Sequence, residues 1–537
     1  MTAPITLFLA SYPPSSMERG QGGEVTQSDD KLYRIPYNNF EASMPGYVSM
    51  RMRFVFRIIS ALVLATLILG LASCGVIGEF RQSLVESTRA AAASGASARA
   101  SGRPGATVPP TATSTPAPTS ALAIDPAQLK GVTISFWHPW TGAAGKVIAD
   151  LVDEFNRSNT WGISVVPTAQ GSYDQLDEAV ATRLKTGELP DITVAYLYQA
   201  LAWNASGAAL VDLSAYVDDP VWGLDGPAQA DFYPVFWEHD LQDGKRLGLP
   251  AQGSAQVLYY NATWARELGF NSPPSTSEEF KRQACAASQA ALRDQDSKND
   301  HKGGWIISTN YTAVLGWIYA FGSTIEAPDG GGYRFDTPEV GQAFDYLRDL
   351  LDGGCAWLSE SQYPEAEFAS RLGLFATGSA AGVPFQESAF VDAGSQDEWS
   401  VLPFPSPTGD AVMPVYGPSF QVMSATTEKQ LASWLLIKWL TEPAQQAALT
   451  QVSSYFPVRA SSLELMGVLP AAHPQWKTAL ELLPLARHEP ALASWRIVRW
   501  AVSDAATQLY RYYFEIDKVP TLIKLLEQTA NDLNTKK

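Results

Sequence analysis

Cysteine and histidine are scarce in this chain of 537 residues, which contains three cysteines and five scattered histidines. No H-E-x-x-H or C-x-x-C pattern occurs, and the G-x-S-x-G nucleophile elbow is absent as well. Gly145-Lys146 is not a P-loop, because Trp140 stands where that motif needs its first glycine. The usual zinc, redox, serine-hydrolase and nucleotide-binding signatures are therefore missing. We expect no metal site, no cofactor and no enzymatic activity.

Positive charge is also in short supply. The 38 Lys and Arg residues are outnumbered by 55 Asp and Glu residues, which gives a formal charge of −17 and a pI near 4.8. Nucleic acids and anionic membranes attract basic surfaces, so the composition argues against both as partners. Acidity alone identifies no ligand.

The chain has one long apolar run, which lies in the segment Arg51 to Cys74, RMRFVFRIISALVLATLILGLASC. Three arginines precede the run, and it is shorter than the roughly 20 residues that a membrane-spanning helix needs. An export signal at residues 50–73 is favoured over a transmembrane anchor. The ending LASC resembles the lipobox of bacterial lipoproteins, and this resemblance implies that Cys74 is acylated and holds the mature protein on the membrane.

The segments on either side of this signal are polar. Residues 1–49 show no sustained periodicity, so they are a disordered extension or precede a translation start at Met50 or Met52. Residues 74–128 are rich in Ala, Ser, Thr and Pro and cannot bury enough apolar surface to offset their ordering entropy. We predict that they form a linker. Because an exported protein reaches a compartment that permits disulfides, we predict that Cys285 and Cys355 pair, with two buried free thiols as the alternative.

The folded part begins near Gln128 with a pattern of alternating strands and helices. Strands are predicted at 132–137, 163–166 and 192–196, with amphipathic helices at 145–156 and 173–184 between them. Ser172-x-x-Gln175 has the form of a capping box. Further on, a strand is expected at 256–260 and another within YGPSFQVMS, and helices begin at Thr276, Thr337 and Thr427. The order β-α-β-α-β predicts an α/β fold.

Aromatic residues are plentiful, with 16 Trp and 21 Tyr, and several follow predicted strands. In an open α/β sheet, ligands bind beyond the carboxyl ends of the strands. An aromatic ring can cover the apolar face of a sugar while amides and hydroxyls hydrogen-bond to its hydroxyl groups. This pattern favours a carbohydrate-binding site.

The motifs VTISFWHPWTG, TGELPDITVAY, GLPAQGSAQVLYYN, FATGSAAGVPF and YGPSFQVMSATTEKQ, in this order, resemble the extracellular solute-binding proteins of family 1, which serve ABC importers of sugars. The resemblance covers about residues 129–533. It implies a two-lobed periplasmic-binding-protein-like fold of type II, with a hinge and a ligand cleft between the lobes. Lobe 1 would comprise 129–253 plus 418–457, and lobe 2 would comprise 254–417 plus 458–537.

The resemblance also implies a set of residues that contact the ligand. These residues fall at six places that the family uses. They are the first loop, the segment after the third strand, the first crossing between lobes, a pair that replaces the Pro-Trp of many relatives, the returning strand, and a C-terminal aromatic. In that order these are Trp137, His138 and Trp140; Tyr196 and Tyr198; Gln252; Phe385 and Gln386; Tyr416 and Phe420; and Trp495.

The expected function is capture of a disaccharide or oligosaccharide by a monomer that delivers it to the permease subunits of an ABC transporter at the cell surface or in the periplasm. A polyol, a glycerol phosphate derivative or a peptide is an alternative ligand. The absence of an Arg/Lys cluster from the predicted cleft loops counts against a phosphate. A secreted glycosidase, whose two carboxylates need only meet in space, and an adhesin without a small ligand are the other classes.

Overall fold

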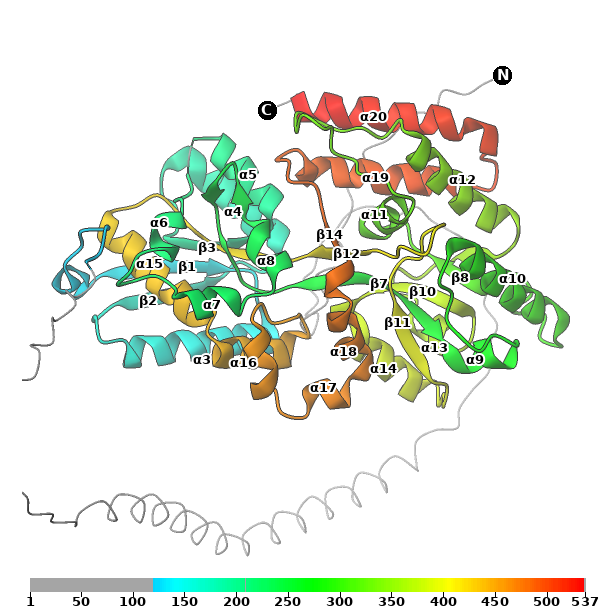
Figure 1. Ribbon diagram of the computed structural model, residues 1–537, viewed down its shortest axis with the longest axis horizontal. Coiled ribbons are helices and arrows are strands. Elements are labelled where there is room, and N and C mark those ends of the chain that lie inside the picture. The colour runs from blue at the N-terminus through cyan, green and yellow to red at the C-terminus, as the bar shows by residue number, and fades with distance from the viewer. Residues whose placement is uncertain (1–118, 208, 536–537) are drawn as a thin grey trace, which may run out of the picture. The chain divides into compact units, whose positions relative to one another are not determined.

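The computed structural model describes residues 119–535 apart from residue 208, and Figure 1 shows two sheets, each flanked by helices. The predicted signal segment and Cys74 lie outside the described residues. Within the described residues, no helix combines the length and apolarity that a membrane crossing needs.

The first sheet has the strand order β2-β1-β3-β13-β6. Its strands are β1 (Thr133–His138), β2 (Ser164–Ala169), β3 (Ile192–Ala195), β6 (Leu249–Pro250) and β13 (Ser419–Val422). Strand β1 runs parallel to β2 and β3, whereas β13 runs antiparallel to β3. Helices α3 (Gly142–Ser158) and α4 (Tyr173–Thr186) connect the parallel strands. The predicted β-α-β-α-β unit is confirmed.

The helix starts follow their local sequence closely. Ser172 and Gln175 form the reciprocal capping box that was predicted for α4, and Gly187 ends this helix in the left-handed conformation at φ 83°. The helix predicted to begin at Thr427 does begin there, but its capping residue is the preceding Thr426. Thr426 caps α15 (Thr427–Leu440), because its side chain accepts the N–H of Lys429.

The second sheet has the order β14-β12-β7-β10-β8-β9, and β11 pairs with β7. Its strands are β7 (Ser254–Asn261), β8 (Gly303–Ile307), β9 (Ala356–Leu358), β10 (Gly373–Ser379), β11 (Trp399–Leu402), β12 (Met413–Tyr416) and β14 (Ala486–His488). Every residue of β7 is buried, as expected of a strand that is covered on both faces.

The chain passes from one sheet to the other at two adjacent places. Ala251, Gln252 and Gly253 separate β6 from β7, and Gly417 and Pro418 separate β12 from β13. A Cβ atom on Gly417 would lie 2.2 Å from the carbonyl oxygen of Gln252, so the two crossings touch through their backbones. The strand expected in YGPSFQVMS is therefore two strands that belong to different sheets.

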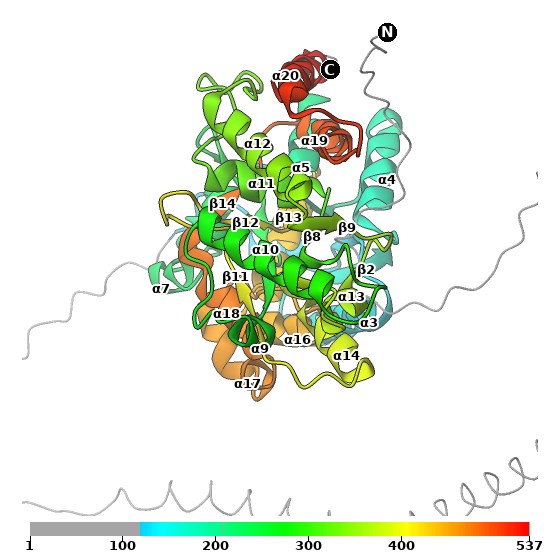
Figure 2. The same ribbon diagram turned by 90° about the vertical axis from the view of Figure 1, so that its right-hand side faces the viewer.

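Four helices form a layer over the second sheet. They are α11 (Tyr311–Ala320), α12 (Pro338–Asp352), α19 (Trp495–Leu509) and α20 (Val519–Thr535). Figures 1 and 2 both show α19 between α20 and α11. Helix α19 also reaches α5 (Leu197–Ala205), which follows β3 of the first sheet. It therefore joins the two halves of the fold.

Most of the remaining elements are short, but α10 (Ser277–Arg293) has 17 residues and packs on β8 and β10 of the second sheet. In chain order, the remaining elements are α6 (Ser214–Val217), α7 (Gly226–Ala230), α8 (Pro234–His239), β4 (Leu241–Gln242), β5 (Lys245–Arg246), α9 (Ala262–Glu267), α10, α13 (Glu365–Ala369), η4 (Ala380–Gly382), α14 (Val383–Asp392), α16 (Pro443–Ser453), η5 (Ala460–Leu465), α17 (Leu469–Ala472), α18 (Pro474–Glu481), η6 (Leu483–Leu485) and η7 (Ile516–Lys518).

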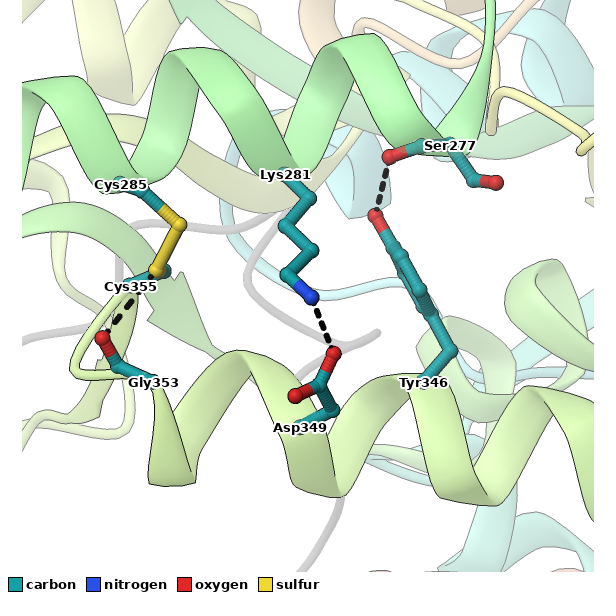
Figure 3. Close-up of a disulfide and its surroundings, with 7 residues drawn as sticks. All are labelled: Ser277, Lys281, Cys285, Tyr346, Asp349, Gly353 and Cys355. Atoms are coloured by element: carbon teal, nitrogen blue, oxygen red, sulfur yellow. Dashed lines mark hydrogen bonds and ion pairs between the residues drawn. A yellow bond between two sulfur atoms is a disulfide. The ribbon is translucent and has the colours of Figure 1, made fainter.

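The predicted disulfide is present. Cys285 of α10 is bonded to Cys355, which lies just after α12, and the two Cα atoms are 4.2 Å apart. Figure 3 shows that Lys281 and Asp349 form an ion pair further along the same two helices, and that the Tyr346 hydroxyl donates to the Ser277 carbonyl oxygen at 2.7 Å. The bridge thus locks a helix pair that packing and polar contacts already align.

The linker predicted at 74–128 is too long at its C-terminal end. The Ser120 hydroxyl and the Ala121 N–H both donate to Asp219, at 2.7 and 3.0 Å. The 3-10 helix η3 (Pro126–Leu129) follows, and Leu129 is fully buried against α15. Leu122, Ile124 and Leu129 provide the apolar surface that the composition of this segment as a whole did not reveal.

Candidate ligand-binding site

Aromatic residues gather where β1 and β3 end and β13 begins. His138 and Trp140 stack with ring centroids 5.7 Å apart, and Trp140 meets Phe420 edge-on at 6.1 Å. All three are buried. Burial lowers the pKa of His138 to about 4, so its imidazole is neutral near pH 7, and its Nδ1 has no hydrogen-bond partner. The predicted first loop is thus brought to the start of the returning strand.

Of three predicted residues in this region, one faces away and two already hydrogen-bond to other side chains. Successive strand residues point to opposite faces, so Trp137 points away from Phe136 and His138 and lies under Arg183 of α4 at 6.0 Å. Trp140 donates its Nε1–H to Gln252 at 3.0 Å, and Gln252 donates in turn to Ser453 at 2.6 Å. Gln252 and Trp140 therefore tie the crossing between the sheets to the first loop.

Three tyrosines form a row beyond β3. Tyr173 meets Tyr196 at 4.9 Å, and Tyr196 stacks on Tyr198 at 5.6 Å with ring planes only 2° apart. Burial raises the pKa of Tyr196 and of Tyr198 well above the ordinary value, so both hydroxyls stay protonated. The Tyr196 hydroxyl has no hydrogen-bond partner, so this group at the centre of the row can donate a hydrogen bond to a ligand.

Helix α19 extends this row from the opposite side. Trp495 is fully buried and meets the Tyr311 ring at 5.9 Å and 82°. One turn later, the Arg499 guanidinium lies 4.7 Å from the Tyr198 ring and 5.6 Å from the Tyr311 ring, and it donates to the Tyr198 hydroxyl. The side chains of α19 thus meet those of α5 around one buried polar centre.

Carboxylates surround this centre. Arg499 pairs with Asp174 and Arg496 pairs with Asp177, each at 3.2 Å. Glu489, which is 8% exposed, has no cationic group within ion-pair distance among the described residues, and its Oε1 has no hydrogen-bond partner. Burial raises the pKa of Glu489 to about 7, although Arg499 opposes the shift.

The other predicted residues line a cavity of about 90 Å³ beside β10 and α14. Phe385, Gln386 and Tyr416 lie in its wall together with Gln256 and Tyr259. Gln386 is buried and donates to the Glu365 carbonyl oxygen, whereas the Phe385 ring is 40% exposed. Gly378 allows the Tyr259 ring to approach, because a Cβ there would lie 2.5 Å from the ring.

The structure thus collects the predicted residues into three neighbouring groups rather than one. His138, Trp140, Phe420 and Gln252 form the first; Tyr196, Tyr198 and Trp495 the second; Phe385, Gln386 and Tyr416 the third. Sequence reasoning missed Arg499 and Glu489. Arg499 follows Trp495 by four residues and therefore lies on the same helix face, a spacing that could have identified it.

The residue types that bind metals are not clustered among the described residues. In the described part of the chain, no group of three His, Cys, Asp or Glu side chains is placed to hold a metal ion. The site instead offers aromatic faces, hydroxyls, amides, one buried guanidinium and one buried carboxylate, which suit a polar organic molecule.

The family model of bacterial extracellular solute-binding proteins matches residues 150–482. The chain belongs to this family. The sn-glycerol-3-phosphate-binding periplasmic protein of Yersinia enterocolitica is 25% identical over 352 residues, which cover 62% of this chain and 75% of that protein.

Two solved structures show the same two-lobed fold. The cyclic α-maltosyl-1,6-maltose binding protein of Arthrobacter globiformis matches with a TM-score of 0.63 and 19% identity over 76% of this chain and 100% of its own. The sugar-binding protein MalE of Xanthomonas citri matches with a TM-score of 0.63 and 20% identity over 75% of this chain and 98% of its own. The predicted fold class and family are confirmed.

Proposed function

We propose that this solute-binding protein captures a disaccharide or oligosaccharide between its lobes and delivers it to the permease of an ABC importer. One observation carries the proposal: α19, which packs on α11 and α20, meets α4 and α5 of the other lobe around buried aromatic rings and polar groups. A molecule held there contacts both lobes. The sugar-binding proteins of Arthrobacter and Xanthomonas share the fold and support this ligand class.

Lobe closure supplies the signal to the permease in this proposal. A ligand that touches both lobes stabilises the closed arrangement by its differential affinity for the two states. The lobe boundaries at 253/254, 417/418 and 457/458 remain part of the proposal. Sheet membership supports the first two, because β6 and β13 belong to one sheet and β7 and β12 to the other.

A phosphorylated polyol is a second candidate, and Arg499 favours it. This guanidinium is 4% exposed and lies at the meeting point of the lobes, and a planar guanidinium suits a phosphate. The glycerol-phosphate-binding relative of Yersinia supports the same class. Asp174 and the Tyr198 hydroxyl occupy Arg499 in the structure, so a phosphate would have to replace at least one of them.

The membrane tether at Cys74 completes the proposal. An acyl chain on that thiol would keep a monomeric receptor near its permease at the cell surface or in the periplasm. Substituting Cys74 with Ala should release the protein from the membrane fraction and abolish labelling by a radioactive fatty acid. Retention on the membrane with unchanged labelling would contradict the tether and leave the binding function intact.

Ligand titration of the full chain in detergent tests the function. If the ligand is a sugar, maltotriose should raise the unfolding midpoint of the protein and bind with measurable heat. If the ligand is a phosphorylated polyol, sn-glycerol 3-phosphate should produce both effects instead. Tyr198→Ala should weaken binding at least about tenfold, because an aromatic face and a hydroxyl are lost. Tyr512→Ala is the control, since that ring is 91% exposed.

Two outcomes would contradict the receptor function. Binding of neither ligand class, tested with sugars, polyol phosphates and peptides, would favour an adhesin or scaffold. Release of new reducing ends from maltotriose at catalytic protein concentrations would indicate a glycosidase. Equal weakening by Tyr198→Ala and Tyr512→Ala would place the ligand elsewhere.

A further inference from the structure

A second and larger cavity, of about 940 Å³, lies between α8 and the segment that runs from α18 through η6 to β14. It shares no lining residue with the cavity beside Tyr259. Figure 2 shows α18 and β14 on one side of the molecule and α13 and α14, which border the smaller cavity, on the other. The larger cavity is therefore separate from the groups around Phe385 and Tyr416.

Most of the residues that line this cavity are apolar or carry a flat aromatic ring. The apolar part comprises Pro234, Val235, Leu463, Leu480, Leu483 and Pro484. His239 and His488 also line it, and their rings stack with centroids 4.2 Å apart and planes 17° apart. Burial lowers the pKa of His239 to about 4 and that of His488 to about 3, so both rings are neutral near pH 7. These surfaces suit the apolar body of an organic molecule.

The charged groups of the wall all have one sign. Glu238, Glu326, Glu481 and Glu489 line the cavity, and no Lys or Arg is among its lining residues. Glu481 forms an ion pair with Lys477, and Glu326 accepts the Ala491 N–H at 2.6 Å. Glu489 lines this cavity and also interacts with Tyr311, which is not among the lining residues. Its side chain is 8% exposed, and one of its two carboxylate oxygens has no hydrogen-bond partner. Arg499 acts electrostatically on Glu489 from the side of Tyr311 but forms no ion pair with it, and a buried carboxylate without a paired cation is costly.

We propose that this cavity is a second ligand site, separate from the group of Tyr196, Tyr198 and Trp495 although Glu489 borders both, and that it takes an organic cation with an ammonium group on an apolar body. The ammonium group would lie between Glu326 and Glu489, where it supplies the missing positive charge. The apolar body would lie on the leucine and proline side chains and against the imidazole pair. Binding of the cation favours the charged form of Glu489, so affinity should rise between pH 6 and pH 8.

Binding of the phenethylammonium ion to the full chain in detergent tests the site, with 2-phenylethanol and phenylacetate as neutral and anionic compounds of similar shape. We expect the ammonium ion to bind at least about tenfold more tightly than either, because charged hydrogen bonds are worth about 1.5–3 kcal/mol. Glu326→Gln and Glu489→Gln should each weaken the binding of phenethylammonium about tenfold or more. Glu515→Gln, a change at an exposed residue on the loop before α20, should leave it unchanged.

Three results would overturn the proposal. They are equal binding of the three compounds, unchanged affinity in both Glu326→Gln and Glu489→Gln, and no binding of phenethylammonium up to about 10 mM, which corresponds to less than about 3 kcal/mol. Tyr198→Ala separates this site from the proposed function. That variant should lose the cleft ligand and keep phenethylammonium, so loss of both would place the cation in the cleft and refute a second site.

Discussion

Arg499 of α19 lies 3.2 Å from Asp174 of α4, and this contact joins a helix of the layer over the second sheet to a helix that connects strands of the first. One turn earlier on α19, Arg496 makes the same kind of pair with Asp177, also at 3.2 Å. Asp177 is buried, and burial raises its pKa although Arg496 opposes the shift. Two parallel ion pairs therefore hold α19 on α4.

Substituting Arg499 with Gln should loosen this contact. The variant removes a buried charge that bonds to Asp174 and Tyr198, so we expect the free energy of unfolding to fall by about 2–3 kcal/mol. Small-angle scattering of the ligand-free protein should show a larger radius of gyration. Arg487→Gln is the matched control, because Arg487 is exposed. An unchanged scattering curve in Arg499→Gln would show that the pair does not hold the lobes together.

Removing the disulfide should destabilise the second lobe. Cys285 and Cys355 are 70 residues apart in sequence, and in the chain-entropy model closing a loop of that length stabilises the fold by about 4 kcal/mol. The double change Cys285→Ser and Cys355→Ser should lower the denaturant midpoint clearly. The same shift should appear when the unaltered protein is unfolded in a reducing agent. An identical midpoint with and without the reducing agent would contradict this expectation.

Two glycine-to-alanine changes should have opposite signs. Gly417→Ala places a methyl group 2.2 Å from the Gln252 carbonyl oxygen, where both crossing backbones must shift, and should cost about 1–3 kcal/mol. Gly341→Ala lies in α12 with nothing within 4 Å of the new Cβ, and should stabilise by about 0.5–1 kcal/mol. Denaturant unfolding of both variants measures the difference. Equal effects would mean that the crossings are more loosely packed than the structure shows.

The pH dependence of stability should reveal Glu489. Its pKa is about 7 in the folded protein and has an ordinary value of 4.5, so the folded state holds more protons than the unfolded state between these values. Stability from this group is complete below about pH 4.5 and is lost as the pH rises to about 7. Glu489→Gln mimics the protonated form. Its stability relative to the unaltered protein should therefore increase by up to about 3 kcal/mol from pH 4.5 to pH 8.

Calorimetric or denaturant unfolding at several pH values checks this expectation. A constant difference between Glu489→Gln and the unaltered protein across the range would mean that the carboxylate finds a cation or water in solution. A difference that decreases with pH would reverse the sign of the argument and place a positive partner beside Glu489.

Local patterns predicted the fold well because each depends on neighbours in the chain. The alternation of strands and helices in residues 132–196 and the capping box of Ser172 depend only on residues close together in the sequence. The split of YGPSFQVMS between two sheets depends on Gln252 and β3, which are far away in sequence. No local signal could show this.

The candidate site was predicted in part for the same reason. The expectation that ligands bind beyond strand ends pointed to His138, which stacks on Trp140, and to Tyr196 and Tyr198, which stack on each other. Trp137 was predicted to contact the ligand together with His138, and in the structure the alternation of β1 turns it toward Arg183 instead. Arg499 was missed because its partners Asp174 and Tyr198 lie more than 300 residues earlier in the chain.

The hydrogen bonds of Ser120 and Ala121 to Asp219 have a mechanical consequence. They fix the start of the described chain to the lobe of the first sheet, and the burial of Leu129 reinforces the attachment. A pull on the N-terminal side of residue 120 is therefore borne by one lobe alone. The lobe of the second sheet is attached to the loaded lobe through the crossings at Gln252 and Gly417 and through the ion pairs of α19 with α4.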